Sequence, residues 1–110
     1  MIVVFLSRAA GDIIMFGDVA KRMMEIMGKD VADRGIVTVE QLPDAIARLK
    51  AAIAADKAER AGKPDGDLPH KERSEDGGSR PFVSLTQRAV PLLELLELSL
   101  KKNKPVVWGV

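Results

Sequence analysis

The sequence lacks most of the side chains that carry catalytic and metal chemistry. It contains no cysteine and no tyrosine, and its one histidine is His70. Without cysteine the chain forms no disulfides, thiolate zinc sites or cysteine-bound iron–sulfur clusters. Nucleophilic and acid–base catalysis also draws heavily on histidine, cysteine and tyrosine. These absences favour, without requiring, a protein that is not an enzyme and that has no metal and no cofactor.

An excess of charge of one sign and a long apolar run are also missing. The chain has 17 Lys and Arg against 16 Asp and Glu, which gives a net charge of +1. Because nucleic-acid binders carry a basic excess or stripe, we expect no nucleic-acid partner. No apolar stretch is long enough to cross a bilayer, and the first one, Ile2–Leu6, is shorter than the core of a signal peptide. The sequence predicts no membrane association and a cytoplasmic protein.

Three stretches of β-branched and aromatic residues predict strands near 2–6, 13–16 and 106–110. The first two are expected to form an antiparallel hairpin around a turn at Gly11, with the last strand paired inside the sheet. Both hairpin strands are apolar on both faces, whereas a strand with one face in water alternates between apolar and polar residues. Either helices cover both faces of the sheet, or a second subunit covers one of them.

Three helices are predicted from the 3.6-residue spacing of apolar side chains. The first has Asp18 as its N-cap and ends at Gly28, and a loop follows over 29–36. The second follows a capping box at Thr38–Gln41, with a distorted first turn before Pro43. The third follows a capping box at Ser84–Gln87. The fold class is therefore α+β, with a small antiparallel sheet packed against three helices in one domain spanning 1–110.

The segment 63–80 is expected to be a long mobile loop before the last helix. It consists of Gly, Pro, Ser and charged residues, with Leu68 as its one large apolar side chain. Such a segment cannot bury enough apolar surface to offset the entropy of ordering. His70 lies in this segment without a fixed set of neighbouring ligands, so we predict no metal site there.

The start of the third helix is a candidate anion site. Ser84 and Gln87 lie where backbone N–H groups are free at a helix N-terminus, and Arg88 adds a guanidinium. Simple helix capping beside a surface arginine is the alternative interpretation of the same three residues. A third interpretation makes two carboxylates among Asp12, Asp18 and Glu25 an acid–base pair, which requires burial to separate their pKa values.

Three apolar residues near the end of the chain are candidates for an interface. Val90 and Leu98 fall outside the apolar stripe of the third helix, on the side that carries its charged residues. They are either scattered surface residues or a second contact face. Trp108 is either an interface anchor or a core residue whose indole N–H meets a carbonyl.

Several segments resemble one bacterial family. They are Ser7–Met15, Ile26–Lys29, Gly35–Ile36, Glu40–Ile46, Val83–Glu94 and Val107–Val110. Their sequences are similar to those of the bacterial proteins, mostly from proteobacteria, grouped as domain of unknown function family 1840. The resemblance covers nearly the whole chain except 63–80, and it implies a single small domain and a cytoplasmic bacterial setting. It carries over no activity and no site residue.

The sequence therefore favours a small non-enzymatic cytoplasmic protein. We expect it to act by protein–protein interaction or by self-association, as a homodimer or with an unidentified protein partner. The alternative is a small-ligand or anion-binding protein that uses the N-terminus of the last helix.

Overall fold

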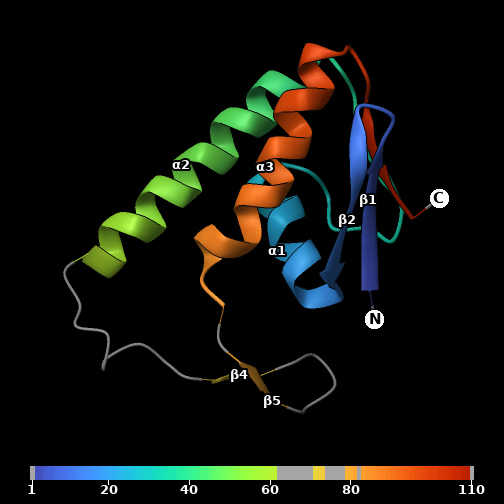
Figure 1. Ribbon diagram of the computed structural model, residues 1–110. Helices are drawn as coiled ribbons and strands as arrows, with labels where there is room; N and C mark the ends of the chain where they lie inside the picture. Colours follow the sequence, from blue (N-terminus) through green and yellow to red (C-terminus); the bar gives the residue numbers. More distant parts are fainter. Residues whose placement is uncertain (1, 62–70, 74–78, 82, 110) are drawn as a thin grey trace.

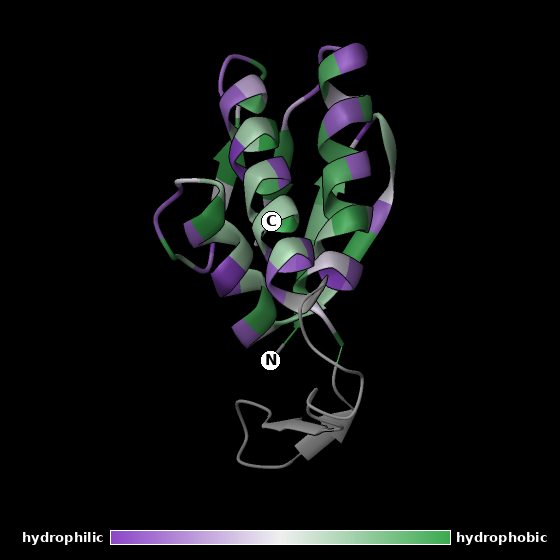
Figure 2. Cartoon of the chain, turned by 90° about the vertical axis from the view of Figure 1, so that its left-hand side faces the viewer, coloured by the Kyte–Doolittle hydropathy of each residue, from purple (hydrophilic) through white to green (hydrophobic). Residues whose placement is uncertain are grey.

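The computed structural model describes residues 2–61, 71–73, 79–81 and 83–109. Three helices lie on one side of a four-stranded sheet, which confirms the predicted α+β class (Figure 1). Seen from the helix side, the helices stand between the viewer and that sheet (Figure 2). In chain order the elements are β1 (Ile2–Ser7), β2 (Ala10–Phe16), α1 (Gly17–Ile26), β3 (Gly35–Val37), α2 (Leu42–Ala61), β4 (Lys71–Arg73), β5 (Ser79–Pro81), α3 (Leu85–Lys101) and β6 (Val106–Trp108).

The sheet has the order β2-β1-β6-β3, and all its neighbours are antiparallel. The prediction that the C-terminal strand lies inside the sheet is confirmed, because β6 pairs with β1 on one side and with β3 on the other. Strand β3 was not predicted, and its first two residues fall in the expected loop over 29–36. With three residues it shows no alternation of its own, and it is defined only by its pairing with β6.

The turn of the β1–β2 hairpin lies earlier than predicted. Ser7 pairs with Ala10, so the turn is formed by Arg8 and Ala9, while Gly11 lies within β2. The hydroxyl of Ser7 accepts a hydrogen bond from the backbone N–H of Ala9 at 3.1 Å, which stabilises this turn locally. A serine at the end of a strand therefore fixes the turn instead of the glycine.

The start of α1 also differs from the prediction, whereas its end agrees. Phe16 is the N-cap, without a side-chain capping hydrogen bond, and Asp18 lies in the first turn, so Asp18 as the N-cap is wrong. Strand β2 runs directly into α1, which brings the helix start forward. At the end, Gly28 has a φ of 78°, and the N–H of Lys29 bonds to the carbonyl of Met24 at 2.9 Å. These are the features of a Schellman motif.

Helix α2 begins as predicted. The amide oxygen of Gln41 accepts the N–H of Thr38 at 3.1 Å, and the hydroxyl of Thr38 accepts the N–H of Gln41 at 3.3 Å. The turn within this capping box, residues 39–41, leads directly into the regular helix, which runs from Leu42. Asp44 in the first turn forms an ion pair with Arg48, four residues later, at 2.7 Å.

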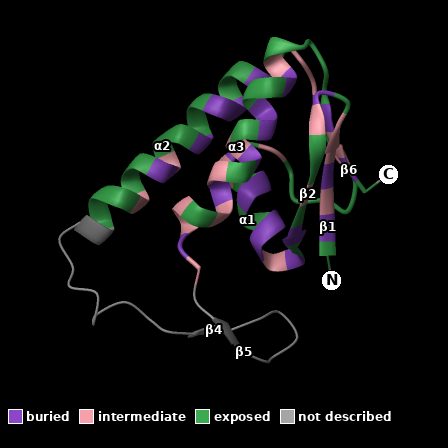
Figure 3. Ribbon diagram, in the orientation of Figure 1, coloured by how far each residue is buried: buried purple, intermediate pink, exposed green. Residues whose placement is uncertain are grey.

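The core lies between the helices and the inner face of the sheet (Figure 3). The rings of Phe5 and Trp108 meet there with centroids 5.7 Å apart. The indole N–H of Trp108 donates to the carbonyl of Ala32 at 3.0 Å. The hydroxyl of Ser99, a buried polar group, donates to the Leu95 carbonyl at 2.6 Å and lies 2.7 Å from the Ser7 hydroxyl. The core therefore ties β1, β6 and α3 together with few polar groups, each of which is satisfied.

Within the segment 63–80, predicted as a mobile loop, the structure describes two short strands. β4 and β5 pair antiparallel in a small sheet of their own, which the sequence did not predict, whereas the mobility of the segment stays a prediction. Side-chain pattern does not reveal such short strands. The rest of the prediction, including His70, lies outside the described residues.

Candidate functional site

The face of the four-stranded sheet turned away from the helices carries a continuous set of apolar side chains. Along β1, Val3 and Phe5 point into the core, whereas Ile2 is 62% exposed. On the neighbouring strand Ile14 is 66% exposed. We call this surface the outer sheet face. It comprises Ile2, Val4, Leu6, Ile14, Phe16, Ile36 and Val107.

The strand register joins these residues into one patch. Directly opposed residues in a sheet point to the same side, so each cross-strand pair places two apolar side chains in contact range. The helices cover only the other face, and exposed apolar patches of this kind mark interaction surfaces. Within the residues that the structure describes, one apolar face of the sheet is therefore uncovered. The pairs are Ile2 with Phe16, Val4 with Ile14, Leu6 with Val107, and Ile36 with Val107.

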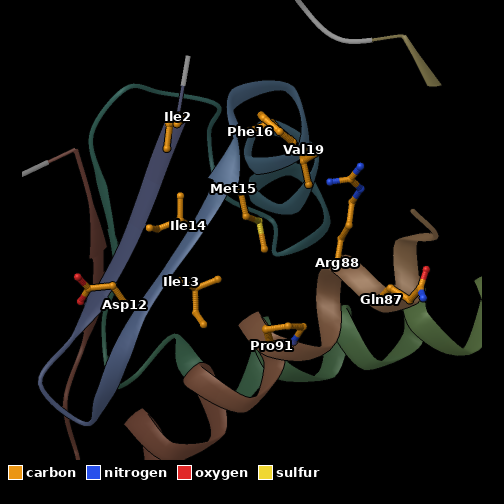
Figure 4. A pocket seen from close by; sticks show the side chains of 10 residues that line it. All are labelled: Ile2, Asp12, Ile13, Ile14, Met15, Phe16, Val19, Gln87, Arg88 and Pro91. Carbon is orange, nitrogen blue, oxygen red and sulfur yellow. The ribbon is translucent and has the colours of Figure 1, made fainter. Parts of the chain in front are cut away.

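A groove of about 550 Å³ runs along the free edge of β2 (Figure 4). Ile13 and Met15 line it from the strand, and Arg88 and Pro91 line it from α3. Ile2, Ile14 and Phe16 of the outer sheet face border the same groove. The apolar patch is thus continuous with the strand edge and with the flank of α3.

The other end of the outer sheet face has a polar rim. Arg8, Asp12 and Lys104 line a second pocket of about 600 Å³ together with Leu6 and Val107. An apolar centre with a polar margin is the usual composition of a protein interface.

The capping box at the start of α3 is formed as predicted. The hydroxyl of Ser84 accepts the N–H of Gln87 at 3.2 Å, and the amide oxygen of Gln87 accepts the N–H of Ser84 at 3.2 Å. The Nε of Arg88 donates to the carbonyl of Val83 at 3.4 Å. The three residues of the candidate anion site are therefore close together, and each already makes a hydrogen bond within the chain.

A carboxylate from α2 reaches the same helix end. Asp56 accepts the N–H of Thr86 at 3.2 Å and the hydroxyl of Thr86 at 2.7 Å. A negative side chain is favourable at this position because of the helix dipole. The chain thus supplies its own anion at the start of α3.

The candidate interface residues occupy three different environments. Trp108 is 1% exposed and belongs to the core, so its ring is not on the surface of the chain. Val90 is half-buried and packs against the core, and Leu98 is 40% exposed on α3. Leu98 lies on the exposed flank of α3 together with Gln87, Pro91 and Glu94.

The remaining carboxylate candidates lie on two elements, β2 and α1. Asp12 is exposed on β2, while Asp18 and Glu25 lie on α1, with Glu25 exposed. Among the described residues no three His, Asp or Glu side chains are grouped so as to hold a metal ion. None of the helices in those same ranges is long and apolar enough to span a membrane.

The family model described as Domain of unknown function (DUF1840) matches residues 1–108. The chain belongs to this family. No curated protein and no solved structure matches it. As a member of DUF1840 the chain gains no assigned activity, so its function has to be argued from the geometry above.

Sequence reasoning recognised strands that are apolar on both faces but did not name the outer sheet face. The signal was present in Ile2 and Ile14, whose neighbours in the chain are equally apolar. Which of two apolar faces the helices cover is decided by tertiary packing, so the sequence alone does not select it. Ile36 was missed because β3 was expected to be a loop.

Proposed function

We propose that the protein is a non-enzymatic binding module, which acts by associating with another protein or with copies of itself. The contact surface is the outer sheet face with the adjoining groove along β2. The observation that carries the proposal is the uncovered row of apolar side chains, of which Ile14 at 66% and Ile2 at 62% are the most exposed. Covering such a row removes apolar area from water at about 25 cal/mol per Å².

The test is the solution mass by light scattering across a concentration series, for the wild-type chain and two variants. We expect the mass to rise above the 11.9 kDa of one chain. Ile14→Lys should return it to that of one chain, because a charge in the middle of the patch must be desolvated. Val31→Lys is the control, since Val31 is 45% exposed but lies outside the sheet.

A constant monomer mass, together with no specific protein partner retained by the immobilised chain, contradicts the proposal. Equal loss of association in Ile14→Lys and Val31→Lys also contradicts it, because the contact would then not involve the outer sheet face. Thermal unfolding of both variants verifies that they are folded.

A small-ligand or anion-binding function is the second candidate, supported by Gln87 and Arg88, which line the groove, and by Ser84, which is hydrogen-bonded to Gln87. Because Asp56 already accepts from Thr86, an anion would have to displace a carboxylate. This function predicts shifts of the amide resonances of residues 85–88 with millimolar phosphate. If these resonances do not shift at that phosphate concentration, the anion-binding function is ruled out.

We also propose a bacterial, cytoplasmic setting, with proteobacteria as the source. The resemblance of the Val83–Glu94 segment supports the source, and the absence of cysteine is compatible with a reducing compartment. Cell fractionation with an antibody against the chain tests the location.

A further inference from the structure

The two edges of the sheet differ in how readily they can accept another strand. β3 has three residues, and short edge strands resist pairing. β2 has seven residues, with Asp12 as its one charged residue and an apolar run from Ile13 to Phe16. Every second residue of an edge strand directs its N–H and C=O groups away from the sheet, where another strand can bond to them. β2 is therefore the edge that favours β-strand addition.

Helix α3 runs alongside β2 in the opposite direction, which fixes the residues on each side of the groove. The Nζ of Lys102 donates to the carbonyl of Ala9 at 3.0 Å, just before β2 begins. From Ala9 to Ile14 a strand advances about 17 Å, and from Lys102 back to Pro91 a helix also advances about 17 Å. Pro91 is therefore level with the middle of β2, as Figure 4 shows beside Ile13.

We propose that two copies of the chain join through their β2 edges, antiparallel, about a two-fold axis beside Ile14. The two four-stranded sheets then form one sheet of eight strands. This inference rests on the proposed function and makes it specific, because the occupant of the groove is a second copy. In this register Ile14 meets Ile14 of the second copy, and Ile13 meets its Met15. Both central pairs are apolar, and such cross-strand pairs are favourable.

Charge complementarity on α3 supports a second copy as the occupant. Arg88 and Glu94 lie three residues before and after Pro91, or about 4.5 Å on either side of the axis. The two-fold rotation therefore places Arg88 level with Glu94 of the second copy, and the reverse pair follows by symmetry. Arg88 lines the groove, and Glu94 is exposed, with no ion-pair or hydrogen-bond partner for its carboxylate among the described residues. The surface is thus complementary to itself.

Single-cysteine cross-linking tests the position of the axis, because the natural chain has no cysteine. Directly opposed antiparallel residues have Cα atoms about 4.5–5.5 Å apart, which suits a disulfide. We expect Ile14→Cys to form a covalent dimer under mild oxidation. Ile2→Cys is the matched control, with 62% exposure against 66% for Ile14. It lies on β1, so the two copies of that residue are separated by at least three strand spacings, about 14 Å.

Charge reversal tests the contact between the helices. Arg88→Glu or Glu94→Arg alone opposes like charges twice in the dimer, and each should raise the dissociation constant about tenfold. The double variant should restore it. Arg88 and Glu94 are six residues apart on one helix and do not face each other, so the rescue cannot arise within one chain. Circular dichroism and thermal unfolding verify that each variant is folded.

The outcomes separate this inference from the proposed function. Preferential cross-linking of Ile14→Cys with charge-reversal rescue supports the two-fold pairing. A different result is that the chain associates and Ile14→Lys prevents this, but Ile2→Cys cross-links as fast as Ile14→Cys or the charge reversals have no effect. In that case the sheets pack face to face. The inference is then wrong while the proposed function stands. A wild-type chain that stays monomeric overturns the inference, and the proposed function then depends on a different protein.

Discussion

At the scale of single residues, Gly35 has no space for a side chain. A Cβ at Gly35 would overlap the indole ring of Trp108, which is buried and held by its hydrogen bond to Ala32. Gly35→Ala should therefore destabilise the fold by about 2–3 kcal/mol, because the ring has no room to move. This corresponds to a fall in Tm of roughly 10–20 °C for a chain of this size.

Gly11→Ala is the control for Gly35→Ala. A Cβ at Gly11 meets nothing within 4 Å, and its backbone does not have a positive φ. We expect an unchanged or slightly higher Tm, because alanine loses less backbone entropy on folding than glycine. If Gly11→Ala and Gly35→Ala lower the Tm equally, a Cβ is tolerated equally at both positions, which would contradict this packing.

Asp56 is a second residue whose hydrogen bonds to α3 carry a measurable effect. Asp56→Ala removes the acceptor of two hydrogen bonds from Thr86, so it should lower the free energy of unfolding by about 1–2 kcal/mol. Asp44→Ala is its matched control on α2, since that carboxylate makes an ion pair with Arg48. Urea unfolding should show that Asp44→Ala lowers the free energy of unfolding by about 0.5 kcal/mol or less, because an exposed ion pair is screened by water. The reverse order would contradict the role given to Asp56.

At the scale of elements, the end of α3 uses an uncommon residue. Asn103 has a φ of 57°, and the N–H of Lys104 bonds to the carbonyl of Ser99 at 2.8 Å. Asn103→Gly should stabilise the chain by up to about 1 kcal/mol, because glycine adopts this conformation without steric cost. Asn103→Ala should destabilise it by about 1 kcal/mol. Thermal unfolding compares the two, and a stabilising alanine would show that the left-handed conformation is absent.

The elements also show how far sequence reasoning reaches. Both capping boxes and Gly28 could be predicted, because each is a local pattern in which a side chain or a missing Cβ satisfies nearby backbone groups. Asp18 was assigned as the N-cap because Gly17 and Asp18 are typical of a break before a helix, whereas β2 passes directly into α1. β3 could not be predicted, because it depends on β6, some seventy residues later.

At the scale of the whole molecule, the segment between α2 and α3 is expected to be dispensable for folding. β4 and β5 form a sheet separate from the four-stranded one, and the contact of Asp56 with Thr86 already holds the two helices together. Replacing 63–80 with six Gly and Ser residues, which span up to about 20 Å, should change the Tm by less than about 5 °C. Loss of the cooperative unfolding transition in this variant would contradict the expectation.

The candidate site belongs to this largest scale, and that explains why sequence reasoning found only part of it. The apolar strands predicted that either helices cover both faces of the sheet or a second subunit covers one of them, and the described helices lie on one face. The groove along β2 exists because α3 lies beside a strand some eighty residues earlier. Trp108 was a reasonable interface candidate by residue type, but its position in a central strand places it in the core.

The central position of β6 has a consequence for the order in which the molecule is made. β1 and β3 belong to the same sheet only because residues 106–108 lie between them. While the chain is being synthesised, the β1–β2 hairpin and β3 cannot join into one sheet until residues 106–108 have left the ribosome. Joining β1 to β6 closes a loop of about one hundred residues, and such non-local pairing is slow. During that interval the hairpin exposes two strand edges instead of one, so the nascent chain is more prone to aggregation than the finished protein.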